Sequence, residues 1–274
     1  MIVRNTVWGL PVAVEMTLLA IASFAVVWAY VFWRRGEVKP ALVGGAAGVV
    51  LPAIALGILA SELLKPPTYG TLVLPLFNPG ANLSSWMVWG ATGISLLILW
   101  ALLFTLPLAL GKIAVWGKSR AVMNALGILM SAFGIYAAVY TGLVLAYERG
   151  VPFWHSAAVP LLALFMGLAA GSGLYGLLGK REVAPWVAIG GALTALTWAA
   201  HLHLSSIGPG VAAYSAVGAM ADPSSVAGLA LAVVGALAAW VGKKPGLIAG
   251  GVMVMTAVFL IRLSLLAWGA WDFP

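Results

Sequence analysis

Long apolar runs dominate the chain, and proline, glycine or charged residues bound each of them. Several runs exceed the roughly 18 to 20 residues that a helix needs to cross about 30 Å of hydrocarbon. None shows the short apolar and polar alternation of a membrane β-barrel strand. The pattern predicts an all-α polytopic membrane protein with eight transmembrane helices. We expect spans near residues 11–33, 41–63, 86–107, 121–146, 156–178, 185–205, 224–241 and 247–268.

These spans indicate a single integral membrane domain over residues 1–274, which we expect to form two packed four-helix bundles. Glycines recur inside the spans, and small residues of this kind allow transmembrane helices to approach closely. The first run is of full membrane length, and its basic block (Arg34, Arg35 and Lys39) follows it. A cleaved signal peptide has its basic residues before the apolar run, so we interpret this run as the first span.

Basic residues are distributed unequally between the loops. Loops after odd-numbered spans hold ten of them, whereas the opposite side holds Arg4, Lys65 and Arg149. The ten are Arg34, Arg35, Lys39, Lys112, Lys118, Arg120, Lys180, Arg181, Lys243 and Lys244. Because cytoplasmic loops carry the excess of Lys and Arg, we predict a multi-pass protein of the cell membrane with both termini extracytoplasmic.

Composition narrows the class further. With 63% hydrophobic and 8% charged residues, the chain has too little polar surface to cover a soluble globule. The net charge of +7 is spread over short loops, which argues against a nucleic-acid partner. There is no cysteine, so the chain can form no disulfide and cannot bind an iron–sulfur cluster through thiolates.

Two connections on the expected outer side are longer than the others, at residues 65–85 and 206–224. Both are rich in glycine, proline and small polar residues, which is typical of structured loops. Long loops on one side and short ones on the other indicate an outer docking surface.

Chargeable and aromatic polar side chains within the spans gather in their outer halves. They are Glu15, Glu62, Tyr140, His201, His203 and Arg262, and a loop after the fourth span adds Trp154 and His155. Ionisable groups inside hydrocarbon are costly and usually face a cavity or a partner. The pattern predicts one partly buried polar site beneath the outer face, with apolar walls suited to a lipid-soluble ligand.

Each of these residues also has a structural interpretation. Glu15 either neutralises Arg262 in a buried ion pair or handles protons, and Glu62 is either interfacial or a proton carrier. Tyr140 either packs or binds a ligand through its hydroxyl, while Trp154 fits an aromatic belt as well as a ligand site. His155 is equally suited to an interface or to proton donation.

The sequence gives little support for a metal or haem site. Two haems with bis-histidine ligation need four imidazoles, and the chain has three histidines. His201 and His203 lie two positions apart, so they do not share a helix face. A single haem on either one lacks an evident second axial ligand on another span. We therefore predict no metal site.

The chain resembles the NrfD/polysulfide reductase membrane-subunit family in four stretches. They are F-N-P-G-A-N-L-S-S-W-M-V-W-G at 77–90, Y-T-G-L-V-L-A-Y at 140–147, P-F-W-H-S-A-A-V-P at 152–160 with G-L-A-A-G at 167–171, and L-I-R-L-S-L-L-A-W-G at 260–269. Their order and spacing, together with eight spans, extend the resemblance over nearly the whole chain.

This resemblance implies a membrane anchor that exchanges electrons between menaquinone or ubiquinone and a separate subunit, with no haem or iron–sulfur cluster of its own. The partners would be a four-cluster ferredoxin-like iron–sulfur subunit and a molybdopterin catalytic subunit, both on the outer face. Tyr140 matches the family's quinone-contacting tyrosine. We expect Glu15, His155 or Trp154 to complete the quinone site, with Glu15, Glu62 and Arg262 serving as proton carriers or a buried ion pair.

Two other classes stay open at this point. A secondary transporter would place the polar groups in an outer vestibule, although the sequence shows no convincing internal repeat and no ionisable residue near the midplane. A structural anchor would keep the fold without quinone chemistry. In either case the chain would not hold the catalytic centre of an oxidoreductase.

Overall fold

The computed structural model describes residues 2–4, 8–61, 83–111, 114–148, 150–208 and 210–272, and it is almost entirely helical. Eight helices in these residues are long and apolar enough to cross a membrane, which confirms the predicted class. They are α1 (Leu10–Arg34), α2 (Val38–Ser61), α4 (Trp86–Leu110), α5 (Arg120–Ala146), α6 (Ala158–Leu177), α7 (Ala184–Ser206), α9 (Pro223–Trp240) and α10 (Lys244–Ala267). Short 3-10 turns precede three of them: η3 (Val115–Lys118), η4 (Pro152–Trp154) and η5 (Arg181–Val183).

The predicted spans differ from these helices by at most three residues at each end, apart from residue 63, which lies outside the described residues. The boundaries follow local chemistry. Proline stands in the first turn of α1, α7, α9 and α10, where no amide donor is needed. Ser119 and Asp222 cap α5 and α9 by accepting hydrogen bonds from backbone N–H groups.

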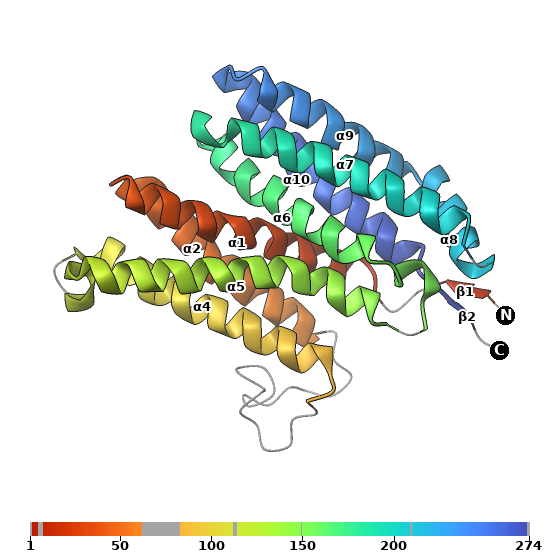
Figure 1. Ribbon diagram of the computed structural model, residues 1–274, viewed down its shortest axis with the longest axis horizontal. Helices are drawn as coiled ribbons and strands as arrows, with labels where there is room; N and C mark the ends of the chain where they lie inside the picture. The colour runs from red at the N-terminus through yellow and green to blue at the C-terminus, as the bar shows by residue number, and fades with distance from the viewer. Residues whose placement is uncertain are drawn as a thin grey trace.

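The spans pack in two groups of four (Figure 1). One group consists of α1, α2, α4 and α5, each of which packs against its neighbours. The other consists of α6, α7, α9 and α10. Helices α1 and α6 pack together across the middle and are the most buried spans. Gly171 of α6 lies against the α1 backbone at Phe24 and Ala25, where a side chain would collide, so this close contact depends on glycine.

Both ends of the chain meet at one end of the molecule (Figure 1). Strand β1 (Ile2–Arg4) pairs antiparallel with β2 (Ala270–Asp272), and η4 and helix α8 (Gly210–Ala221) contact this region. We call this end the terminal face. The end that carries the α1–α2, α6–α7 and α9–α10 turns is called the opposite face.

One expected loop is in fact mostly helical. The glycines, prolines and serines of residues 206–224 predict a structured loop, but residues 210–221 form α8. Its buried residues (Val211, Ala212, Ser215, Ala216 and Ala219) recur with helical spacing, and its alanines favour a helix. With 12 residues, α8 is too short to span a bilayer and lies along the terminal face. Most of the other long connection, residues 65–85, lies outside the described residues.

Candidate functional site

Four polar side chains from three helices meet beneath the terminal face. They are Glu15 of α1, Tyr140 and Thr141 of α5, and Arg262 of α10, with exposed fractions of 5%, 6%, 1% and 2%. We call them the buried polar set. Each lies within about two turns of the helix end at the terminal face. Helices distant in the sequence therefore bring chargeable groups together in the half of the molecule that the sequence indicated.

Arg262 is held by a hydrogen bond. Its Nη2 donates to Thr141 Oγ1 at 3.2 Å, and the Thr141 hydroxyl donates in turn to the carbonyl of Ala138 at 2.9 Å. The Nε of Arg262 is buried and has no hydrogen-bond partner among the described residues. A buried guanidinium nitrogen without a partner is costly, so the position of Arg262 requires compensation from a nearby negative charge or a polar ligand.

Glu15 lies within electrostatic range of Arg262. Its carboxylate interacts electrostatically with Arg262 and with the hydroxyl of Tyr140. No nitrogen of Arg262 lies within 4.0 Å of a Glu15 oxygen, so the two residues do not form a direct ion pair. The ion pair that the sequence suggested between Glu15 and Arg262 is therefore present only as a longer-range electrostatic interaction.

A small cavity adjoins Arg262. It measures about 10 Å³ and is lined by residues of α5, α6 and α10, among them Thr141, Val159, Met166 and Leu265. This volume admits about one water molecule. A quinone ring cannot enter it, so any such ligand has to approach the buried polar set from another side.

Tyr140 offers a different side. Its ring lies among Leu19 of α1, Ala55 of α2 and Ile94 of α4, and it stacks on Tyr136 with ring centroids 6.1 Å apart. A Cβ atom at Gly90 of α4 would overlap the ring, so glycine at that position makes room for it. Within the described residues the Tyr140 hydroxyl makes no hydrogen bond, which leaves a donor free in apolar surroundings.

The η4 segment places its two candidate residues differently. Trp154 is fully buried, donates from Nε1 to the carbonyl of Leu265 at 2.8 Å, and stacks on Trp8 at 5.5 Å. These contacts tie η4 to α10 and to the start of α1. His155 is exposed on the terminal face, outside the buried polar set.

The remaining candidates do not join this set. Glu62 lies outside the described residues. His201 is fully buried between the rings of Phe153 and Trp198, at centroid distances of 4.8 and 5.7 Å. Neither of its ring nitrogens has a hydrogen-bond partner in the part of the chain that the structure describes. His203 is exposed, which confirms that the two histidines occupy different helix faces. The described residues contain no group of three or more His, Cys, Asp or Glu that could hold a metal ion.

Sequence reasoning missed Thr141. Threonine is common in apolar helices, where its hydroxyl bonds to the preceding turn, so its presence alone signals nothing. Its position next to Tyr140 in Y-T-G was a usable signal, because a buried arginine on a distant span needs an acceptor.

Chemically, the set combines a donor hydroxyl, a carboxyl group and a buried cation within apolar walls. Such groups can hydrogen-bond a carbonyl, stabilise negative charge that develops on a bound molecule, and exchange protons with it. The set has no nucleophile with an adjacent base, so it does not favour covalent catalysis.

Comparison with known proteins agrees with the fold. A family model described as polysulphide reductase, NrfD, matches residues 3–204, which include α1 to α6, all but the last two residues of α7, and thus Glu15, Tyr140 and Thr141. Arg262 lies beyond the matched part. A search of curated proteins found no match. Because the family model covers well over half of an eight-span chain, this multi-pass membrane protein belongs to the polysulphide reductase NrfD family.

Proposed function

We propose that this protein is the membrane-anchor subunit of a respiratory molybdopterin oxidoreductase complex. It exchanges electrons between membrane menaquinone or ubiquinone and an iron–sulfur subunit docked on the terminal face, as in complexes that reduce polysulfide, thiosulfate or tetrathionate in anaerobic respiration. Membership of the NrfD family supports this role. The observation that carries it is the buried polar set, which places Glu15 beside the hydroxyl of Tyr140, which has no hydrogen-bond partner among the described residues, under one face of the bundle.

In this proposal the quinone lies on the Tyr140 side, among α1, α2 and α4. The reason is size, since the cavity beside Arg262 holds about one water molecule. Tyr140 donates a hydrogen bond to a quinone oxygen, and its apolar neighbours exclude water from the ring. A quinone takes up two electrons and two protons when it becomes a quinol.

The other residues act around that contact. Glu15 exchanges protons with the bound molecule, and Arg262, held by Thr141, stabilises negative charge in the site. Trp154 positions η4 against α10, and the exposed His155 passes protons to the aqueous side. All these groups lie toward the terminal face, so protons exchange on that side and pumping is not required.

The partners dock where the termini lie. The terminal face presents α8, η4 and the β1–β2 pair as an ordered surface, whereas the opposite face carries short turns (Figure 1). We propose that a four-cluster ferredoxin-like iron–sulfur subunit covers this surface and passes electrons to or from a molybdopterin catalytic subunit. That arrangement brings an electron carrier close to Tyr140 without any haem or cluster in this chain.

Replacement of Tyr140 tests the proposal. In membranes that contain the assembled complex, Tyr140→Phe should lower quinol-linked turnover about tenfold, because a lost hydrogen bond of roughly 1.4 kcal/mol corresponds to that factor. The matched control is Tyr147→Phe, on the same helix end but 56% exposed and stacked on Trp86. Thermal unfolding should not change in either variant. Full turnover in Tyr140→Phe would remove this residue from the mechanism.

One observation favours a second candidate, a structural anchor without quinone chemistry. The cavity beside Arg262 is too small for a ligand, as expected if the buried polar set only holds helices together. The two functions differ in one measurement on the purified complex. Quinol should reduce the clusters of the partner subunit if the anchor is active, whereas clusters that respond to dithionite but never to quinol would support the inert anchor.

A further inference from the structure

A groove on the opposite face combines basic and apolar side chains. It has a volume of about 480 Å³ and lies where the α1–α2 turn meets the end of α6. Its lining consists of Glu37, Val38, Lys39, Pro40, Val43, Leu178 and Lys180. The groove therefore opens at the seam between the two groups of helices, far from the buried polar set at the terminal face.

The walls of this groove are held in place. Tyr175 of α6 is fully buried, donates its hydroxyl proton to the carbonyl of Pro40 at 2.9 Å, and stacks on Phe32 at 5.0 Å. Lys180 forms an ion pair with Glu37 across the groove, and its ammonium lies 5.2 Å from the centre of the Phe32 ring. The turn between α1 and α2 is thus fixed on α6, so the groove is a stable feature of the fold.

The charge in the groove is positive overall. Glu37 is neutralised by Lys180, which leaves Lys39 with an exposed ammonium and no ion pair within the described part of the chain. The side chain of Lys244 runs beside Gly179, so a third lysine lies next to Lys180. These lysines attract an anion that enters the groove. The single carboxylate of the groove, Glu37, opposes the anion little because it is already paired with Lys180.

Apolar side chains continue from the charged part toward the membrane. Val38, Val43 and Leu178 are exposed by 48%, 39% and 45%, although each belongs to or adjoins a membrane-spanning helix. A soluble anion would gain nothing from them, whereas a lipid chain would cover them. Basic groups that adjoin apolar surface at the end of transmembrane helices are typical of sites for anionic lipid headgroups.

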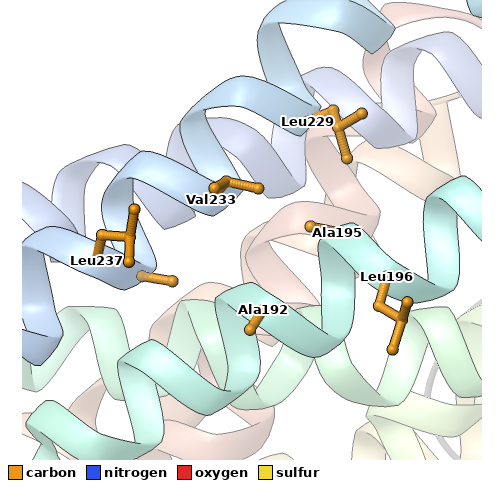
Figure 2. Close-up of a pocket in the computed structure, with 7 residues that line it drawn as sticks. Ala192, Ala195, Leu196, Leu229, Val233 and Leu237 are labelled. Atoms are coloured by element: carbon orange, nitrogen blue, oxygen red, sulfur yellow. The ribbon is translucent and has the colours of Figure 1, made fainter.

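From this geometry we infer that the groove binds one anionic phospholipid. Its phosphate lies beside Lys39, next to the Glu37–Lys180 pair, and an acyl chain covers Val43 and Leu178. A second groove, between α7 and α9, provides the contrast (Figure 2). Its volume is about 390 Å³, but its lining consists only of alanine, leucine and valine, so it has no group that could select a headgroup.

Native mass spectrometry of the full chain tests this inference. The delipidated protein in detergent is titrated with phosphatidylglycerol, with phosphatidylcholine, and with inorganic phosphate as competitor. The first phosphatidylglycerol molecule should bind about fivefold more tightly than phosphatidylcholine. Lys39→Gln should lower the affinity for phosphatidylglycerol about fivefold. Lys118→Gln is the matched control, since Lys118 is an exposed lysine of the opposite face outside the groove.

A second pair of variants tests whether an acyl chain binds the apolar part of the groove. Val43→Trp fills the groove and should weaken phosphatidylglycerol binding, while Leu237→Trp fills the α7–α9 groove and should leave it unchanged. Both residues are exposed, so both variants should fold. Equal affinities for the two lipids, equal effects of Lys39→Gln and Lys118→Gln, or displacement by millimolar phosphate would overturn the inference. The last outcome would indicate a free-anion site.

Discussion

Arg262 is a charged side chain in the apolar part of a span, and its contacts explain how it is tolerated there. Thr141 accepts one hydrogen bond from it, and Glu15 interacts with it electrostatically without touching it. Removal of one member of a buried charge pair is more costly than removal of both, because the survivor stays desolvated. The pair should therefore behave as a unit in stability measurements.

We expect Arg262→Met to lower the free energy of unfolding by about 3 kcal/mol, because the buried Glu15 loses the cation that favours its charged form. The double variant Arg262→Met with Glu15→Gln should regain most of that loss. Thermal unfolding in detergent measures both. If the double variant unfolds at the same temperature as Arg262→Met alone, Glu15 does not depend on Arg262.

Asp222 predicts a dependence of stability on pH. It caps α9, and Ser224 donates from its N at 3.1 Å and from its Oγ at 2.6 Å. Burial raises the pKa of the carboxyl group, but hydrogen bonds, first that from the Ser224 side chain, outweigh burial, and the pKa lies below the ordinary value of 3.8. A lowered pKa means that this stabilisation is present above pH 3.8 and is lost as the pH falls through the folded-state value.

Asp222→Ala should therefore cost about 1 kcal/mol at neutral pH, and the cost should shrink at low pH. Asp222→Asn is the control, because asparagine caps a helix equally well but does not titrate. Unfolding temperatures measured from pH 3 to pH 7 separate the two variants. A cost for Asp222→Ala that does not vary with pH would argue against titration of this cap.

The members of the buried polar set differ in how visible they are in the sequence. Glu15, Tyr140 and Arg262 could be identified because a polar group at that depth in an apolar run is conspicuous. The placement of Trp154 and His155 could not, since adjacent residues in a short turn point to opposite environments and only the packing of η4 on α10 decides which one is buried.

Among the helices, α4 and α5 make the contact on which the Tyr140 environment depends. Gly90 of α4 leaves space for the Tyr140 ring, and a side chain there would force the ring or the helix to move. Another glycine serves as a comparison, since no other described part of the protein comes within 4 Å of the place where a Cβ of Gly57 in α2 would lie.

Gly90→Ala should destabilise the protein by about 1 to 3 kcal/mol, because the new methyl group overpacks the α4–α5 contact. Gly57→Ala should have no cost or should stabilise by up to about 1 kcal/mol, since alanine favours a helix more than glycine does. Thermal unfolding of the two variants tests this difference. Equal unfolding temperatures would show that Tyr140 can rearrange freely.

The spans themselves were predictable because membrane thickness sets their length and proline and charge mark their ends. Helix α8 was not, because its run of alanine and valine is too short for a span and is flanked by the glycine, proline and aspartate typical of loops. Its helical state depends on packing against α7 and η4, and such contacts are not encoded in a local pattern.

For the molecule as a whole, the distribution of basic residues predicts that the terminal face lies outside the cell. The chain has no cysteine, so single cysteines can report on this without background. In intact cells Ala157→Cys, next to η4, should react with a membrane-impermeant maleimide, and Lys118→Cys should react only after lysis. Both positions are exposed. The reverse pattern would place the terminal face in the cytoplasm and contradict the proposed partner site.

The β1–β2 pair has a consequence for biogenesis. Residues 2–4 leave the ribosome long before residues 270–272, yet they are neighbours in the finished molecule. The N-terminal strand must therefore wait, unpaired, until every span has been inserted. Closure of the pair is then a late step of assembly, and a chain that stalls before α10 is complete leaves β1 without its partner strand.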